Sequence, residues 1–291
     1  MQTPHMYGTI VTEAPEGFVP YHQWPEYKLE TDVPTFLGPR KVGVDPVGMY
    51  RRFWPIVVEE YISDKEPVLV DSDPKKISAN RVLMWQRLFR TDTPAGWKRL
   101  AIKPRELEGF ALLESAYYVA QWSESARRYR KKWREHFLNK ECVVEKISAE
   151  DFKAAYVASD IKPYIRRLYT DMVTRKLAAG APMQFFAARD IRTKTIISAM
   201  AVINSPTCHG SFYLCGFISK KYEHVPAMVG LMDAWHAESL ASGIRFLHFG
   251  RFWQKGDPED WKGFSTFKAK FGLHYISYPP ALWRFVRGKL F

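Results

Sequence analysis

The second half of the chain alternates between strand-like and helical patterns of apolar residues. Apolar runs typical of strands lie at residues 142–147, 183–189, 195–204, 210–218, 244–249 and 274–278. Helical spacing predicts helices that start at a capping box at 148–151 and that cover 226–242 and 262–271, with Gly243 as a C-cap. Turn residues separate the strands between 183 and 218, so we expect an antiparallel meander there.

The first half of the chain is less regular. Residues 1–55 hold eight of the nineteen prolines, mixed with aromatic residues, which predicts an extended arm that lies across a folded surface, either the protein's own or a partner's. The apolar positions of residues 80–89 recur at helical spacing, so we expect a helix there. We divide the chain into the arm 1–55, a helical or mixed segment 56–120 of unknown role, and a domain 121–291.

A strongly basic helix is expected at residues 123–140, with Ser123 as its N-cap. Tyr129, Trp133 and Phe137 recur every four residues and are predicted to dock the helix. The basic side chains around this stripe are predicted to contact a nucleic acid, and they are Arg127, Arg128, Arg130, Lys131, Lys132 and Arg134.

Composition narrows the class of protein and its partners. The chain has 291 residues, is 46% apolar and carries a formal charge of +12, which favours a polyanionic partner such as RNA, DNA or an anionic lipid surface. The alternative is a basic surface that only confers solubility. The three cysteines lack C-x-x-C spacing, so neither a zinc site nor a disulfide scaffold is expected. With no spanning segment and no secretory signal, we expect a cytoplasmic protein.

Candidate chemistry gathers in the last third of the chain. The run 260–272 places Lys268 and Lys270 between Phe267 and Phe271. On the strand before it, period-two alternation predicts that His248 shares one face with Phe246 and Phe252, whereas Arg251 lies on the other face.

The order strand, helices, meander, helix, strand, helix, strand resembles the acyltransferase domain of the GNAT superfamily. Three local segments, at residues 125–134, 241–250 and 264–272, are similar to the Fem-like type, which includes aminoacyl-tRNA-dependent transferases and related acetyltransferases. This resemblance covers the last three-fifths of the chain. It implies an α/β (α+β) fold, with a central mixed, mostly antiparallel twisted sheet flanked by helices.

The resemblance also implies a reaction centre. Phe267 and Lys268 match the Phe-Lys pair of the family's terminal signature, and a fixed ammonium there would stabilise the oxyanion formed when an amine attacks an ester. The alternative is a core stripe of phenylalanines with Lys268 and Lys270 facing solvent. The donor is expected between the strands 212–218 and 245–252, beside Phe217, Lys220, Lys221 and Arg251.

The expected donor follows from a missing feature. The loop 219–227 has no glycine, whereas a CoA pyrophosphate needs close approach of bare backbone amides at a helix start. We therefore disfavour acyl-CoA and expect no cofactor, and no metal is expected either. The resemblance to Fem-type transferases, which take the acyl group from aminoacyl-tRNA and do not need that loop, implies aminoacyl-tRNA as the donor and an amine as the acceptor.

Two further expectations concern the whole molecule. Fem-type enzymes usually carry two tandem GNAT units, and the sequence traces one, which disfavours a peptidoglycan-precursor acceptor. The alternative function is a non-catalytic GNAT-like binding or structural protein, associated with nucleic acid or with an assembly. In either case the N-terminal arm could join copies of the chain into a homo-oligomer or a larger assembly.

Overall fold

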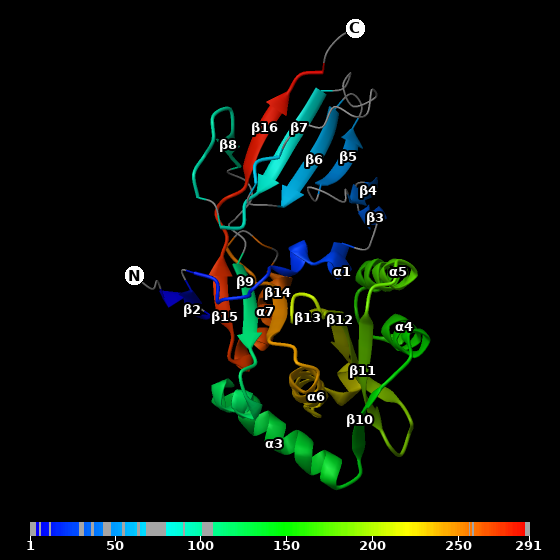
Figure 1. The fold of residues 1–291 in the computed structure, drawn as a ribbon. Coiled ribbons are helices and arrows are strands. Elements are labelled where there is room, and N and C mark those ends of the chain that lie inside the picture. Colours follow the sequence, from blue (N-terminus) through cyan, green and yellow to red (C-terminus); the bar gives the residue numbers. More distant parts are fainter. Residues whose placement is uncertain are drawn as a thin grey trace.

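The protein was analysed as a computed structural model. It describes residues 4–5, 7–11, 13–28, 32–35, 38–42, 48–53, 56–62, 65–67, 80–89, 91–100, 107–255, 257 and 259–288. The strands among these residues form two sheets (Figure 1). One has nine strands in the order β1-β2-β15-β9-β14-β13-β12-β11-β10, and the other has seven in the order β3-β4-β5-β6-β7-β16-β8.

The nine-stranded sheet contains the predicted meander. Its strands are β1 Pro4–His5, β2 Gly8–Val11, β9 Leu107–Leu112, β10 Cys142–Lys146, β11 Met183–Asp190, β12 Ile196–Ser205, β13 Gly210–Ile218, β14 Phe246–Arg251 and β15 His274–Ser277. Strands β10 to β13 pair antiparallel in sequence order, β14 is parallel to β13, and β9 is antiparallel to β14. The predicted fold class, a mixed sheet flanked by helices, is confirmed.

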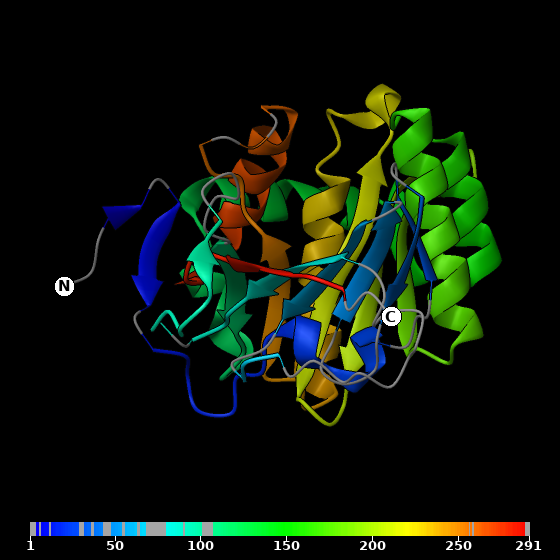
Figure 2. The ribbon, with the colours of Figure 1, turned by 90° about the horizontal axis from the view of Figure 1, so that it is seen from above.

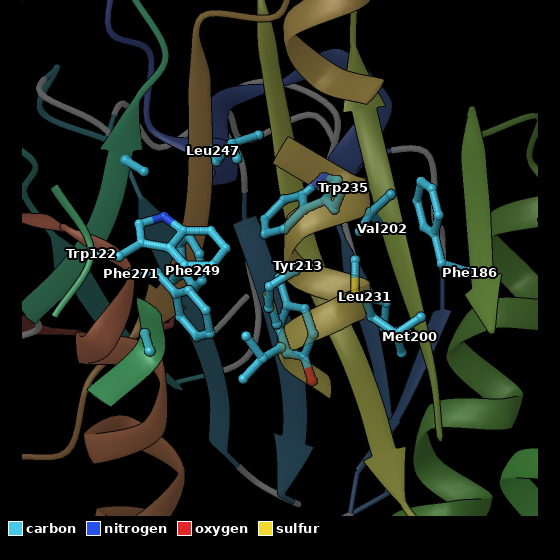
Figure 3. Packing of buried hydrophobic residues seen from close by; sticks show 14 of the residues in the cluster. Trp122, Phe186, Met200, Val202, Tyr213, Leu231, Trp235, Leu247, Phe249 and Phe271 are labelled. Atoms are coloured by element: carbon cyan, nitrogen blue, oxygen red, sulfur yellow. The ribbon is translucent and has the colours of Figure 1, made fainter. Parts of the chain in front are cut away.

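Helices cover both faces of this sheet (Figure 2). They are η1 Tyr21–Gln23, α1 Pro25–Lys28, η2 Ala116–Gln121, α3 Glu124–Leu138, α4 Ala149–Ala158, α5 Pro163–Ala178, η3 Lys220–Tyr222, α6 Ala227–Ala241, α7 Asp260–Lys268 and η4 Ala269–Phe271. The largest apolar cluster joins α3 and α6 to one face, and includes Tyr213, Trp235 and Phe249 (Figure 3). A second cluster joins α4 and α5 to the other face through Phe152 and Val173.

The seven-stranded sheet repeats the pairing order of the nine-stranded one. Its strands are β3 Asp32–Thr35, β4 Gly38–Val42, β5 Gly48–Phe53, β6 Ile56–Ile62, β7 Asn80–Gln86, β8 Lys98–Arg99 and β16 Leu282–Val286. Strands β3 to β6 form an antiparallel meander, β7 is parallel to β6, and β16 is antiparallel to β7. A second sheet with this pairing order, which the sequence did not reveal, is therefore present.

The two sheets exchange strands. Strand β9 follows the strands of the seven-stranded sheet in sequence but pairs with β14, whereas β16 follows the nine-stranded sheet but pairs with β7. In each sheet, the strand next to the parallel pair thus comes from the end of the sequence segment that forms most of the other sheet. The two sheets are therefore interlocked.

The prediction of a helix at residues 80–89 is wrong. Residues 80–86 form β7, in which Arg81, Leu83 and Trp85 are buried at period two. Leu83 and Trp85 pack with Leu282 of the neighbouring strand β16. Tertiary pairing on both edges of β7 overrides the local helical spacing of its apolar residues.

The basic helix forms as predicted but docks differently. Ser123 caps α3 by accepting a hydrogen bond from the Ala126 amide, at 3.2 Å. Trp133 is buried. A Cβ added at Gly230 of α6 would lie 2.2 Å from Cε2 of Trp133, so α6 needs glycine at this crossing. Tyr129 and Phe137 are 37% and 51% exposed, so the prediction that they dock the helix is wrong.

The N-terminal segment around residues 18–27 includes η1 and α1 and packs on the protein's own fold. Trp24 is fully buried in the cluster on the α4 and α5 face. Glu26 accepts hydrogen bonds from the hydroxyls of Ser205 and Thr207, at 2.7 and 3.0 Å. The buried ammonium of Lys176 in α5 donates to the carbonyl of Tyr27, at 2.7 Å. These contacts fix the segment to both α5 and the end of β12.

Candidate active site

The parallel strands β13 and β14 separate partway along their length. They pair at three positions, Gly210 with Phe246, Ser211 with Leu247, and Phe212 with His248. Both strands then continue, to Ile218 and Arg251, without pairing to each other. Backbone groups of β14 beyond His248 are therefore not satisfied by β13. We call this place the β13–β14 opening.

Lys268, the last residue of α7, satisfies two of these backbone groups. Its Nζ donates to the carbonyl oxygens of Phe249 and Arg251, at 2.7 and 2.8 Å. The ammonium lies 4.5 Å from the ring centroid of Phe252. The Lys268 side chain is 3% exposed, so the alternative in which it faces solvent is wrong.

Burial changes the acid–base behaviour of Lys268. Desolvation lowers its pKa from 10.5 to about 7, against the opposing effect of the Glu108 carboxylate. A protonated amine has three N–H groups and a neutral one has two. Because two are already used by the carbonyls, only the protonated form of Lys268 has an N–H group left for a substrate.

Two other predicted site residues lie next to Lys268. Phe267 is half-buried and packs edge-on against Phe271, with ring centroids 5.2 Å apart. Arg251 forms an ion pair with Asp257, and its guanidinium lies 5.8 Å from the ring centroid of the half-exposed Trp261. The carbonyl of Arg251 is one of the two that bind Lys268. The structure therefore brings Phe267, Lys268 and Arg251 together.

The other predicted donor-binding residues lie elsewhere. Phe217 is buried on the α4 face, where its ring packs edge-on against Tyr156. Lys220 and Lys221 are exposed in η3, after the end of β13. The backbone amide of Lys220 donates to the Asp160 carboxylate, at 2.8 Å.

The start of α6 also has few free amides of the kind that hold a pyrophosphate. Pro226 has no N–H group, and the Ala227 amide donates to the Val225 carbonyl at 2.7 Å. The Val229 amide donates to the Pro226 carbonyl at 3.1 Å. An anion at this helix start would therefore meet few available N–H donors.

The predicted nucleic-acid-binding residues of α3 divide into two groups. Arg130 is half-buried and pairs with Asp233 of α6, at 2.8 Å. Five basic side chains are exposed on the same helix, Arg127, Arg128, Lys131, Lys132 and Arg134, of which Arg134 lies 4.0 Å from Asp233. Arg130 thus docks the helix, and the others form a basic surface.

A β-bulge alters the predicted faces of β14. The register shifts between His248 and Gly250, and Gly250 has a φ of 67°, a conformation that favours glycine. Phe252 consequently packs against Tyr275 in the cluster that contains Phe249. The prediction that Phe252 shares a face with His248 is wrong.

Sequence reasoning missed an ionisable cluster beside β14. The Glu108 carboxylate lies 2.6 Å from Nδ1 of His248 and accepts a hydrogen bond from the Tyr278 hydroxyl. All three side chains are almost fully buried. Glu108 and His248 are 140 residues apart, so no local pattern links them. The only sequence signal was a single acidic residue within the apolar run of β9.

The described residues show neither a candidate metal-binding group nor a candidate membrane-spanning helix. They contain no group of three or more His, Cys, Asp and Glu side chains that could hold a metal ion. Within the same ranges, the helices are too short or too polar to span a bilayer.

Comparisons with known proteins give the fold. No protein-family model matches the chain, and no curated protein matches it in sequence. The structure is similar to a crystal structure of FemX, with a TM-score of 0.63 and 10% identity over 85% of this chain and 87% of that one. L-PGS from Bacillus licheniformis gives a TM-score of 0.52 and 12% identity over 86% of this chain and 85% of that one.

A conserved protein of unknown function from Bacteroides thetaiotaomicron gives a TM-score of 0.56, with 9% identity over 86% of both chains. These likenesses show that the chain has the GNAT-like fold of Fem-type acyltransferases. The suspected resemblance is confirmed at the level of the fold.

Proposed function

We propose that this protein transfers an acyl or aminoacyl group to an amine acceptor at the β13–β14 opening, with aminoacyl-tRNA as the donor. The observation that carries the proposal is the position of Lys268. Its ammonium is buried at backbone carbonyls of β14 beyond the last residue that pairs with β13. Strongly shifted pKa values cluster at functional sites, and burial lowers the pKa of Lys268 to about 7.

The chemistry requires little from the protein besides one fixed donor. The acceptor nitrogen attacks the ester carbonyl carbon, the new C–N bond forms, and the carbonyl oxygen becomes an oxyanion. The C–O bond to the ribose then breaks, and the proton lost by the amine ends on the ribose hydroxyl. The third N–H of protonated Lys268 would stabilise the oxyanion, and its dry surroundings would strengthen that hydrogen bond.

The choice of donor is supported by two surfaces. The amides that would hold a CoA pyrophosphate are engaged at η3 and at the start of α6. The exposed basic side chains of α3 suit a polyanion, and the chain carries a charge of +12. Calorimetry with acetyl-CoA is expected to show millimolar or no binding. A micromolar Kd, about −8 kcal/mol, would contradict the proposal.

The direct experiment measures transfer of a labelled aminoacyl group from charged tRNA to a panel of amines. Lys268→Met removes the ammonium and keeps an unbranched, buried side chain, so we expect turnover to fall about 100-fold or more. Lys270→Met, two residues away at a half-buried position, serves as the matched control. A folded Lys268→Met variant with full activity would exclude the proposed role.

The pH dependence provides a second readout. Because only protonated Lys268 has a free N–H group, the rate should fall as pH rises through about 7. A Lys268→Arg variant that retains activity should lose this decline, since a guanidinium does not titrate in this range. The same decline in both enzymes would assign the titration to another group.

The second candidate is a non-catalytic GNAT-like binding protein. Two hydrogen bonds from Lys268 to backbone carbonyls also suit a purely structural lysine. In that case the parent protein should transfer no aminoacyl group, while Lys268→Met should still alter stability. The second GNAT-like sheet removes the earlier reason for disfavouring an acceptor that needs two units. The acceptor and any role of the N-terminal arm in oligomers stay predictions.

A further inference from the structure

Tyr213 is the first residue of β13 beyond the three positions that pair with β14. The last of those pairs joins Phe212 to His248. The Tyr213 side chain is 3% exposed and lies on the α6 face, in the same apolar cluster as Trp235 and Phe249. In Figure 3 its hydroxyl oxygen points away from Trp235. A buried polar group therefore borders the β13–β14 opening on the β13 side.

The Tyr213 hydroxyl lies beside Gly216, three residues further along β13. The register of β13 against β12 shifts between them, since Val202 pairs with Tyr213 and Ala201 pairs with Cys215, and this bulge brings Tyr213 and Gly216 to the same face. A Cβ added at Gly216 would lie 2.7 Å from the Tyr213 hydroxyl oxygen. The hydroxyl thus occupies the space of a missing side chain. Because Gly216 is only half-buried, this space adjoins an accessible stretch of β13.

The Tyr213 hydroxyl has no hydrogen-bond partner within the part of the chain that the structure describes. Leaving a buried hydroxyl unpaired is unfavourable, so a group of this kind calls for a partner from outside the chain. Burial also raises the pKa of Tyr213 well above its ordinary value of 10, so the hydroxyl keeps its proton. A neutral O–H group that can both donate and accept suits an ester or an amine.

Tyr213 and Lys268 both lie close to the ring of Phe264 in α7. The ring centroids of Tyr213 and Phe264 are 5.8 Å apart, and Lys268 Nζ is 5.0 Å from the Phe264 centroid. Lys268 also packs on Phe252, which belongs to the same cluster as Tyr213, so the two polar groups share one face of the sheet. Phe264 itself is 46% exposed. A substrate that enters the opening beside Phe264 would therefore meet a hydroxyl on β13 and an ammonium on β14.

A second buried hydroxyl in the same cluster shows what distinguishes Tyr213. Tyr275 on β15 is fully buried, and its hydroxyl also lacks a partner among the described residues. Strand β15 is, however, paired on both edges at this position, to Ile10 of β2 and to Gly109 of β9. Of the two tyrosines, Tyr213 is the one that borders an unpaired stretch of backbone, where a ligand could reach its hydroxyl.

We infer that Tyr213 is a further catalytic residue, whose hydroxyl donates a hydrogen bond from the β13 side to the carbonyl oxygen of the donor's ester, while Lys268 donates from β14. This inference rests on the proposed function, because it assigns the second donor of the same opening. The hydroxyl would hold the ester carbonyl before attack and stabilise the oxyanion after it. No proton leaves Tyr213, so the bonds that form and break are those already described.

The test measures transfer of a labelled aminoacyl group from charged tRNA by Tyr213→Phe, which removes only the hydroxyl. The variant should lower kcat about 10- to 100-fold, with a smaller change in KM, because the lost hydrogen bond is strongest to the oxyanion. Tyr275→Phe, which removes the other unpartnered hydroxyl, is the matched control and should keep full kcat. Full kcat in Tyr213→Phe, or the same loss in both variants, would overturn the inference.

Thermal unfolding provides a second readout that needs no substrate. Because the Tyr213 hydroxyl has no partner to lose, Tyr213→Phe should not lower Tm by more than about 2 °C. Tyr118→Phe should lower Tm further, since it removes a hydroxyl that donates to the Asp233 carboxylate at 3.0 Å. An equal fall in both variants would give the Tyr213 hydroxyl a structural role and overturn the inference.

The two proposals fail in different ways. Transfer by the parent protein at a rate that Tyr213→Phe does not change would reject the inference alone. A folded parent protein that transfers no aminoacyl group would reject the proposed function, and the role of Tyr213 with it.

Discussion

The two sheets have the same strand order but differ at their parallel pairs. In the seven-stranded sheet, β6 and β7 pair at seven consecutive positions, from Ile56 with Asn80 to Ile62 with Gln86. In the nine-stranded sheet, β13 and β14 pair at three positions and then separate. A fully paired sheet leaves no backbone groups for a ligand, so the same topology provides a closed sheet in one half and a candidate site in the other.

The residues proposed for chemistry lie beside the open pair. Lys268, Arg251 and the exposed ring of Trp261 all lie around the β13–β14 opening. The closed pair is instead bordered by β16, whose Leu282 packs into an apolar cluster with Trp85 and Trp97. The seven-stranded sheet thus supports the fold through pairing and packing, whereas β13 and β14 of the nine-stranded sheet are unpaired where the reaction is proposed.

The largest expected effect comes from breaking the closed half. Leu282 is fully buried on β16, so Leu282→Ala should reduce the free energy of unfolding by about 2–5 kcal/mol. Phe285, on the same strand and 45% exposed, is the matched control, and Phe285→Ala should cost less than about 1 kcal/mol. Denaturant titration measures both. Equal losses would mean that β16 contributes through pairing alone.

The open half should reveal its buried lysine through pH. The pKa of Lys268 is about 7 in the folded protein and 10.5 is the ordinary value, so between these pH values the unfolded chain binds the extra proton. Stability should therefore rise with pH across this window, by up to a few kcal/mol. Lys268→Met should lack this rise. Parallel stability curves for the two proteins between pH 7 and 10 would contradict the depressed pKa.

The salt dependence of tRNA binding should show whether the basic surface of α3 contacts RNA. Replacing the exposed Arg127, Arg128, Lys131 and Lys132 by glutamine leaves the Arg130–Asp233 ion pair intact. Each phosphate contact contributes roughly 0.7–0.9 to the log–log salt slope, so the slope of tRNA binding should flatten by about three. An unchanged slope would make α3 a solvated face without RNA contacts.

Hydrogen exchange offers the finest comparison. Amides of β14 beyond His248 that face β13 lack a ladder partner, whereas those of β7 that face β6 are paired along the strand. The former should exchange faster under native conditions, because exchange requires no strand separation. Equal protection would indicate that the β13–β14 opening closes in solution.

Much of the nine-stranded sheet was predictable because its signals are local. The meander from β11 to β13 and helix α6 follow from apolar periodicity and from turn residues that adjoin them in sequence. Helix α7 and strand β15 followed for the same reason. By contrast, β9 and β16 are defined by partners more than 100 residues away, and no local pattern marks them as members of the opposite sheet. β7 was misassigned because its apolar residues fit both periods.

The candidate site was predictable in part. The aromatic–basic signature pointed to Phe267 and Lys268, and helical geometry alone suggested solvent exposure for the lysine. Its burial depends on carbonyls that become available only where β13 and β14 separate. Glu108 could not be linked to His248 from sequence, since the two residues lie on different strands and are 140 residues apart.

The strand exchange between the two sheets also has a consequence for biosynthesis. Strand β16 follows every strand of the nine-stranded sheet in sequence, so the edge of β7 that it covers stays unpaired until those strands have been synthesised. Strand β8 also lacks its partner until then, because it pairs with β16. An unpaired edge on a nascent chain can pair with other chains. The seven-stranded sheet is thus the last to be finished, although β3 to β8 are translated before most of the other sheet, and termination anywhere before β16 leaves it incomplete.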